Sequence, residues 1–143
     1  MPLTIEKALG DRLFRSAVVH DLCDNRIYTT HVPQSAKLPY IVLNLISEPH
    51  EQHMTGAAGW ANPAIQVDIF TRNLSDEARL SEGVRLALLA FDGTVSVGGE
   101  TLRVRHMNLR NRFRASDFEN ASDTVTYRTM HEYEAWHPEA IPA

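Results

Sequence analysis

The stretch from residue 38 to residue 91 constrains the fold more than any other part of the chain. Residues 38–46, LPYIVLNLI, are apolar on both alternating faces, which is typical of a well-covered strand. Residues 64–72 alternate instead, with apolar side chains on one face and Gln66 and Asp68 on the other. This pattern predicts a strand with one buried face and one available face, and an amphipathic helix follows it.

Two helices are expected from the spacing of apolar residues. Thr4 can cap a first helix in which apolar residues recur at helical intervals as far as Ala17. Ser75 can cap a second helix that runs to about Phe91. Acidic residues come directly after Ser75, in the first turn, where a helix N-terminus favours negative charge. The apolar stripe of this second helix consists of Leu80, Val84, Ala87, Leu88 and Phe91.

The last third of the chain predicts more strands. Residues 94–104 form a tight hairpin whose turn is Gly98-Gly99, because glycine tolerates the positive φ that two-residue turns need. Residues 111–120 are polar and are predicted to be a loop, and residues 124–136 a long final strand. The expected fold class is α+β: an antiparallel or mixed sheet of about four long strands plus a short hairpin, with two helices packed on one face.

Residues 47–63 are expected to form a long loop between the first two main strands. Loops of this length in a small domain are more often functional than idle. Met54 and Trp60 within it either fold back on the domain or bind a partner, and the sequence leaves both open. Residues 138–143 are expected to be a loose tail. Since no repeat or linker is visible, residues 1–143 are predicted to be a single domain.

Composition excludes several classes of protein. The 43% hydrophobic and 22% charged content of the 143 residues is ordinary for a globular protein. No apolar run approaches the ~20 residues that cross a bilayer, and no basic-then-apolar leader opens the chain, so we expect no membrane partner. A net charge of −4 argues against nonspecific binding of nucleic acid. The single cysteine, Cys23, is expected to be an inert, partly buried thiol.

No set of residues predicts catalysis. His50 and His53, with acidic residues nearby, superficially suggest metal ligands, but no third or fourth ligand on a rigid element is evident. A solvated polar loop explains them more simply. No nucleophile elbow, phosphate loop or dinucleotide fingerprint is present. No catalytic, cofactor-binding or metal residue is therefore assigned, and a small metal-dependent enzyme that uses these histidines remains an alternative.

The arginines are unevenly distributed, and five of them fall between residues 103 and 114. They are either a solvated strand edge that balances the acidic remainder or ion-pairing groups at a subunit or partner interface; contact with passing DNA is the least favoured. The polar face of the predicted sheet is either solvated or packed against a neighbouring subunit. The candidate interface set is Met54, Trp60, Gln66, Asp68, Arg103, Arg105, Arg110, Arg112, Arg114 and Arg128.

Several short segments together resemble a known family. Residues 25–28 (NRIY), 32–34 (VPQ) and 38–42 (LPYIV) are similar to the opening of the tail completion, or tail terminator, proteins of tailed phages. Residues 65–71 (IQVDIFT), the 84–88 segment VRLAL and the late strand from Tyr127 to Trp136 continue the similarity. These motifs are structural rather than catalytic.

The resemblance implies a structural virion protein, made in the host cytoplasm and located in the neck region of the tail. It implies a six-fold ring that caps the head-proximal end of the tail tube and stops tube polymerisation. The implied partners are further copies of the chain, the major tail tube protein and a head-completion or connector protein, with DNA only passing through the lumen. Infectious phage, prophage and gene transfer particle all fit, and another neck adaptor is an alternative. The 47–63 segment is not a family motif, and its contact with the tube is a hypothesis.

Overall fold

The structure, a computed structural model, describes residues 3–53, 56–119 and 124–138. Its helices are α1 (Ile5–Phe14), α2 (Ala17–Cys23) and α3 (Leu74–Leu88). Its strands are β1 (Ile27–Thr29), β2 (Tyr40–Ser47), β3 (His50–His53), β4 (Gly56–Ala61), β5 (Ala64–Thr71), β6 (Gly93–Val97), β7 (Glu100–Glu119) and β8 (Thr124–Pro138). None of the described helices is long and apolar enough to cross a membrane.

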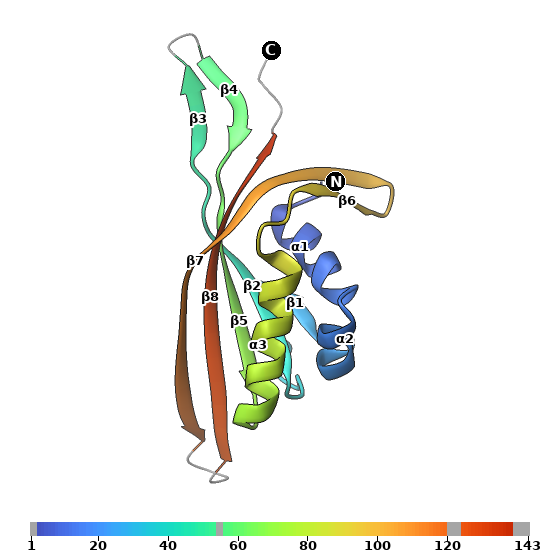
Figure 1. Cartoon of the computed structure of the whole chain (residues 1–143), viewed down its shortest axis with the longest axis vertical. Helices are drawn as coiled ribbons and strands as arrows, with labels where there is room; N and C mark the ends of the chain where they lie inside the picture. The colour runs from blue at the N-terminus through green and yellow to red at the C-terminus, as the bar shows by residue number, and fades with distance from the viewer. Residues whose placement is uncertain (1–2, 54–55, 120–123, 139–143) are drawn as a thin grey trace.

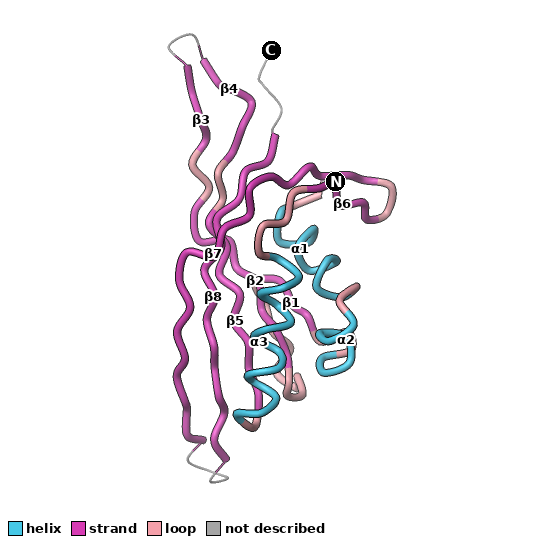
Figure 2. Tube along the Cα trace, viewed as in Figure 1, coloured by secondary structure: helices cyan, strands magenta, loops and turns pink. Residues whose placement is uncertain are grey.

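The strands form one mixed sheet, as the sequence predicts. Its order is β1-β2-β5-β8-β4-β3, and β7 pairs with both β6 and β8. Every pair is antiparallel except β1 and β2, which run parallel. The three helices lie together on one side of this sheet, while the β3–β4 hairpin and the far end of the β7–β8 pair extend in opposite directions (Figures 1 and 2).

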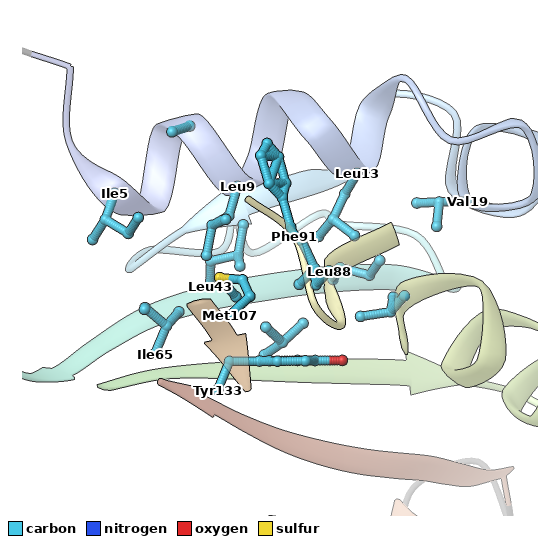
Figure 3. Packing of buried hydrophobic residues seen from close by; sticks show 14 of the residues in the cluster. Ile5, Leu9, Leu13, Val19, Leu43, Ile65, Leu88, Phe91, Met107 and Tyr133 are labelled. Atoms are coloured by element: carbon cyan, nitrogen blue, oxygen red, sulfur yellow. The ribbon is translucent and has the colours of Figure 1, made fainter. Parts of the chain in front are cut away.

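The core lies between the helices and the sheet (Figure 3). Helix α1 contributes Ile5, Leu9 and Leu13, and β5 contributes Ile65 and Ile69, each 3% exposed or less. Each such side chain contributes roughly 1.5–3 kcal/mol by leaving water. The apolar side chains at helical spacing on α1 therefore pack against the alternating apolar side chains of β5. This packing determines the face of the sheet that the helices cover.

The predicted first helix is interrupted. Thr4 caps it as expected, since its side chain accepts a hydrogen bond from Lys7 N at 3.3 Å. However, α1 ends at Phe14, Ser16 is extended, and α2 begins at Ala17. An unbroken helix would direct Ala17 inward; the break instead buries Val19 and Cys23 on α2 and leaves Ala17 exposed. The predicted fold class holds, but the first predicted helix is two shorter helices, so the described residues contain three helices in place of two.

Helix α3 begins earlier than predicted. Asn73, not Ser75, is the N-cap, and its Oδ1 accepts a hydrogen bond from Asp76 N at 2.7 Å. Asparagine caps as well as serine does, so residue type alone does not favour Ser75 over Asn73. The Gly98-Gly99 turn is confirmed: the two residues have φ of +59° and +83°, as a two-residue hairpin turn with positive φ requires.

Two predicted loops are strands. The predicted 47–63 loop contains β3 and β4, which pair with each other, and β4 continues onto the end of β8 through Trp60 and Ala61. The predicted 111–120 loop is strand as far as Glu119, since β7 keeps its register with β8. Both segments are rich in polar residues, so hydrophobic alternation is weak in their sequences, whereas the pairing of the strands is made by the backbone.

Two other expectations meet different outcomes. Cys23 is confirmed as a buried thiol, and burial raises its pKa to about 12. The expected loose tail of 138–143 falls on residues outside the described ranges except for Pro138, which pairs with Trp60 at the end of β8.

Candidate interaction surfaces

The sheet has a second face, opposite the helices, that none of the described helices covers (Figure 1). We call it the outer face. Three of the predicted interface residues meet there in one network. Gln66 Nε2 donates to Asp68 Oδ1 at 2.8 Å, and Arg128 Nη2 donates to Asp68 Oδ2 at 2.9 Å. Asp68 is only 4% exposed, and each of its carboxylate oxygens accepts one of these hydrogen bonds.

Aromatic side chains surround this network. Tyr40 stacks on Phe70 with ring centroids 4.8 Å apart, and Arg128 lies with its guanidinium carbon 5.4 Å from the centre of the Phe70 ring. The register also brings Met130 opposite Phe113, which is 50% exposed. Aromatic residues, Met and Arg are the residue types enriched in protein interfaces. The outer face therefore has the composition of a protein-binding surface.

The arginine-rich segment lies on β7, and most of its charges are paired within the subunit. Arg103 pairs with Asp92, and Arg110 Nη1 lies 3.2 Å from Glu134 Oε2. Arg114 Nη2 lies 2.8 Å from a carboxylate oxygen of Glu77, a residue that is fully buried on α3. Arg112 is exposed on the same strand. The segment is therefore partly an intramolecular set of ion pairs that fixes β7 to its neighbours.

A buried polar chain behind β8 was not predicted from the sequence. Thr129 Oγ1 donates to Glu77 Oε1 at 2.5 Å, His131 Nε2 lies 2.8 Å from Ser81 Oγ, and His131 Nδ1 lies 2.8 Å from the Tyr133 hydroxyl. Burial, and then the nearby charge of Arg112, lower the pKa of His131 to about 4. Burial also raises the pKa of Tyr133. Alternation along the strand places His131 and Tyr133 on one face, but it does not show that Ser81 on α3 is the hydrogen-bond partner of His131.

The predicted residues Trp60 and Arg105 come together in a small cavity. The guanidinium carbon of Arg105 lies 5.7 Å from the centre of the Trp60 ring. With His106 and Trp136 they line a cavity of about 210 Å³ where β4, β7 and β8 meet. Sequence reasoning missed Trp136 and His106, although tryptophan is enriched among the residues that dominate the binding energy of protein interfaces. The last predicted residue, Met54, lies outside the described residues.

The helix side also carries a groove. A cavity of about 670 Å³ lies among α1, α2, α3 and β6, and Val18 and Leu86 beside it are 40% and 66% exposed. The chain therefore has open surfaces on both sides of the sheet. Among the described residues no group of three or more His, Cys, Asp or Glu is placed to hold a metal ion. His50 lies at the start of β3, and the side chain of His53 is outside the described part.

Comparison with known proteins identifies what this fold belongs to. The sequence profile of the family described as "Tail completion protein gp17" matches residues 7–137, which is nearly the whole chain. The chain belongs to this family. Its members are structural proteins of the virion tail rather than enzymes, so the metal-dependent enzyme alternative is not carried further. The resemblance noted in the sequence is confirmed.

Solved structures share the fold of this chain. One, described as the virion of a native gene transfer agent (GTA) particle, aligns with a TM-score of 0.66 at 18% identity over 94% of both chains. A second aligns with a TM-score of 0.50 at 16% identity, over 96% of this chain and 92% of that chain. A search of curated protein sequences found no match. These structures show a shared fold, whereas family membership implies that the chain interacts with other proteins of the virion.

Proposed function

We propose that the protein forms a closed ring, most simply a hexamer, at the head-proximal end of the tail tube. The ring ends tube polymerisation: one side fits the last ring of tube protein, and the other side offers no template for a further ring. That other side receives a head-completion or connector protein. Family membership is the observation that carries this proposal, and the open surfaces of the subunit support it.

A ring needs heterologous contacts, in which two unlike surfaces of the same chain meet and close by rotation. The subunit has such unlike surfaces. One is the outer face with the Gln66–Asp68–Arg128 network, and the other is the helix side with exposed Leu86 and Val18. The β3–β4 hairpin, which extends from one end of the molecule, is our candidate for the contact with the tube (Figure 1). DNA passes through the lumen without binding, in keeping with a net charge of −4.

Deleting the gene tests the proposal by electron microscopy of the particles. We expect tails that are longer than normal and of variable length, without attached heads, because nothing stops addition of tube protein. Complementation with the wild-type gene should restore length and attachment. Tails of normal length joined to heads in the deletion strain would refute both termination and joining.

A neck adaptor is the second candidate, because heads also fail to attach when an adaptor is missing. The two candidates differ in tail length: an adaptor deletion leaves tails of normal length. Labelling an exposed position of the protein with gold in intact particles provides the second distinction. A tail terminator is expected directly on the tube end, and an adaptor between that end and the capsid.

A further inference from the structure

The cavity formed by Trp60, Arg105, His106 and Trp136 has the chemistry of a binding site; we call it the tryptophan pocket. Three strands build it: Arg105 on β7 lies opposite Trp136 on β8, and Trp60 on β4 lies opposite Pro138 of β8. The cavity holds about 210 Å³, enough for a side chain of a partner. Tryptophan and arginine are the residues that most often dominate the binding energy of protein interfaces.

Arg105 is the unusual member of the pocket. Its Nε is buried and has no hydrogen-bond partner within the part of the chain that the structure describes. The carboxylates nearby already have partners: Asp92 pairs with Arg103, and Glu134 pairs with Arg110. A buried donor without an acceptor is costly, and an incoming acceptor removes that cost. The pocket is thus suited to a carboxylate that arrives beside an apolar or aromatic group.

The same chain carries a segment of that composition at the other end of β7. The strand ends with Asp117, Phe118 and Glu119, which pair in register with residues 126, 125 and 124 of β8. Residues 115–126 contain three acidic residues and no Lys, Arg or His. This acidic end is opposite in charge to the arginine-rich stretch that leads to the pocket.

The acidic end cannot reach the pocket of its own subunit. A strand from residue 105 to residue 119 spans roughly 45 Å at ~3.3 Å per residue. The two sites therefore lie far apart along the same β7–β8 ribbon, because the pocket lies where β4 meets β8 and the β7–β8 pair extends away from the β3–β4 hairpin (Figure 1). Only another molecule can bring an acidic end to the pocket, and a second copy of the chain carries one.

We propose that the acidic end of the β7–β8 ribbon of one copy binds in the tryptophan pocket of the next copy. The contact is heterologous, since each copy offers a pocket and an acidic end, and it continues from subunit to subunit until the ring closes. This inference rests on the proposed ring and names the surfaces that join its subunits.

Tryptophan fluorescence makes the contact measurable, because the chain has only two tryptophans and both line the pocket. A synthetic peptide of residues 115–126 is titrated into the wild-type protein. We expect a saturable shift of the emission to shorter wavelength as the indoles lose water. The same peptide with Asp117→Lys and Glu119→Lys should give no shift. Equal shifts with both peptides, or none with either, would overturn the proposal.

Charge reversal tests the contact between whole subunits, with assembly followed by sedimentation velocity. Arg105→Glu alone, or Asp117→Lys with Glu119→Lys, should weaken self-association at least tenfold. Combining all three changes in one chain should restore most of it, because the pairing is head to tail. Arg112→Glu is the matched control on β7, since Arg112 is exposed and does not line the pocket. Asp21→Lys with Asp24→Lys controls for the loss of two acidic residues.

The outcomes separate this inference from the proposed function. Rings of Arg105→Glu that match the wild type, with unchanged tryptophan emission, would refute the pocket contact and leave the ring intact. Emission that responds to purified tail tube protein but not to self-association would assign the pocket to the tube instead, which also refutes the proposal. Normal tails in the gene deletion would refute the ring itself. Circular dichroism establishes that each variant is folded, and the peptide titration needs no variant of the protein.

Discussion

The two faces of the sheet differ in what their side chains do, although neighbouring residues of the same strands form them. On β5, Ile69 is fully buried beneath the helices, whereas Phe70 points to the outer face and stacks on Tyr40. The helix-covered face holds the fold together by packing. The outer face keeps aromatic rings, a shielded Asp68 and an exposed Phe113 without any described helix over them. The comparison separates the residues that stabilise the subunit from those available for assembly.

The largest expected difference comes from substituting those two neighbours on β5. Ile69→Ala removes a buried side chain and leaves a cavity, which should lower the free energy of unfolding by about 2–5 kcal/mol. Phe70→Ala should cost less, on the order of 1 kcal/mol, because the ring is only half-buried on the open face. Urea unfolding of the two variants measures both values. Equal losses would show that the outer face is packed as tightly as the core.

The pH dependence of the free energy of unfolding tests whether His131 is buried on the face that the helices cover. His131 has a folded pKa of about 4 because it is buried, against 6.5 in the unfolded chain. Between these values the unfolded chain binds the proton and the folded protein does not. The contribution of His131 is thus fully present above pH 6.5 and is lost as the pH falls toward 4, by on the order of 3 kcal/mol. His131→Gln should flatten this part of the unfolding profile; an unchanged slope would contradict it.

The next effect tests whether the arginines of β7 serve the fold or the interface. Arg114→Ala leaves the buried Glu77 carboxylate without its ionic partner and should cost about 1–3 kcal/mol. Arg112 lies two residues away on the same strand and is exposed, so Arg112→Ala should change the free energy of unfolding by less than ~0.5 kcal/mol. Thermal unfolding of the two variants compares them directly. If Arg112→Ala lowered the free energy of unfolding as much as Arg114→Ala does, the ion pair with Glu77 would not be the reason for the loss.

The smallest effect on the subunit is expected at Phe113, the most exposed aromatic residue of the outer face. Phe113→Ser should leave the free energy of unfolding within ~0.5 kcal/mol of the wild type, because half of the side chain is already in water. Its effect should appear instead in particles, as fewer capped tails in electron micrographs. A destabilised subunit would show that Phe113 belongs to the fold after all.

Strong patterns made most of the fold predictable. Residues 64–72 alternate clearly, the Gly98-Gly99 pair fixes a hairpin, and helical spacing locates α3 to within two residues at its start. The β3–β4 hairpin and the second half of β7 escaped prediction because the alternation of apolar and polar residues is weak in their sequences. Strands that pair mainly through their backbones need no alternation of apolar and polar residues, and this alternation is the signal by which a strand is predicted.

The candidate surfaces were predictable as residue types but not as groups. Gln66 and Asp68 share a strand face by alternation, and Arg128 is one of the predicted interface residues on the final strand. Only the register of β8 shows that Arg128 reaches Asp68, while Arg114 crosses instead to the buried Glu77 on a distant helix. Trp60 and Arg105 lie 45 positions apart, and they come together because β4 and β7 both pair with the end of β8. Contacts between strands that are distant in the sequence depend on such pairing, which no local pattern encodes.

The buried thiol of Cys23 has a practical consequence for the study of assembly. With no exposed surface and a pKa of about 12, it carries almost no thiolate at neutral pH and does not compete for maleimide reagents. A cysteine introduced on the β3–β4 hairpin or on the outer face becomes the single reactive position in a chain that keeps its native residue. Dyes, spin labels or gold can then be attached at one chosen point of each subunit in the assembled particle.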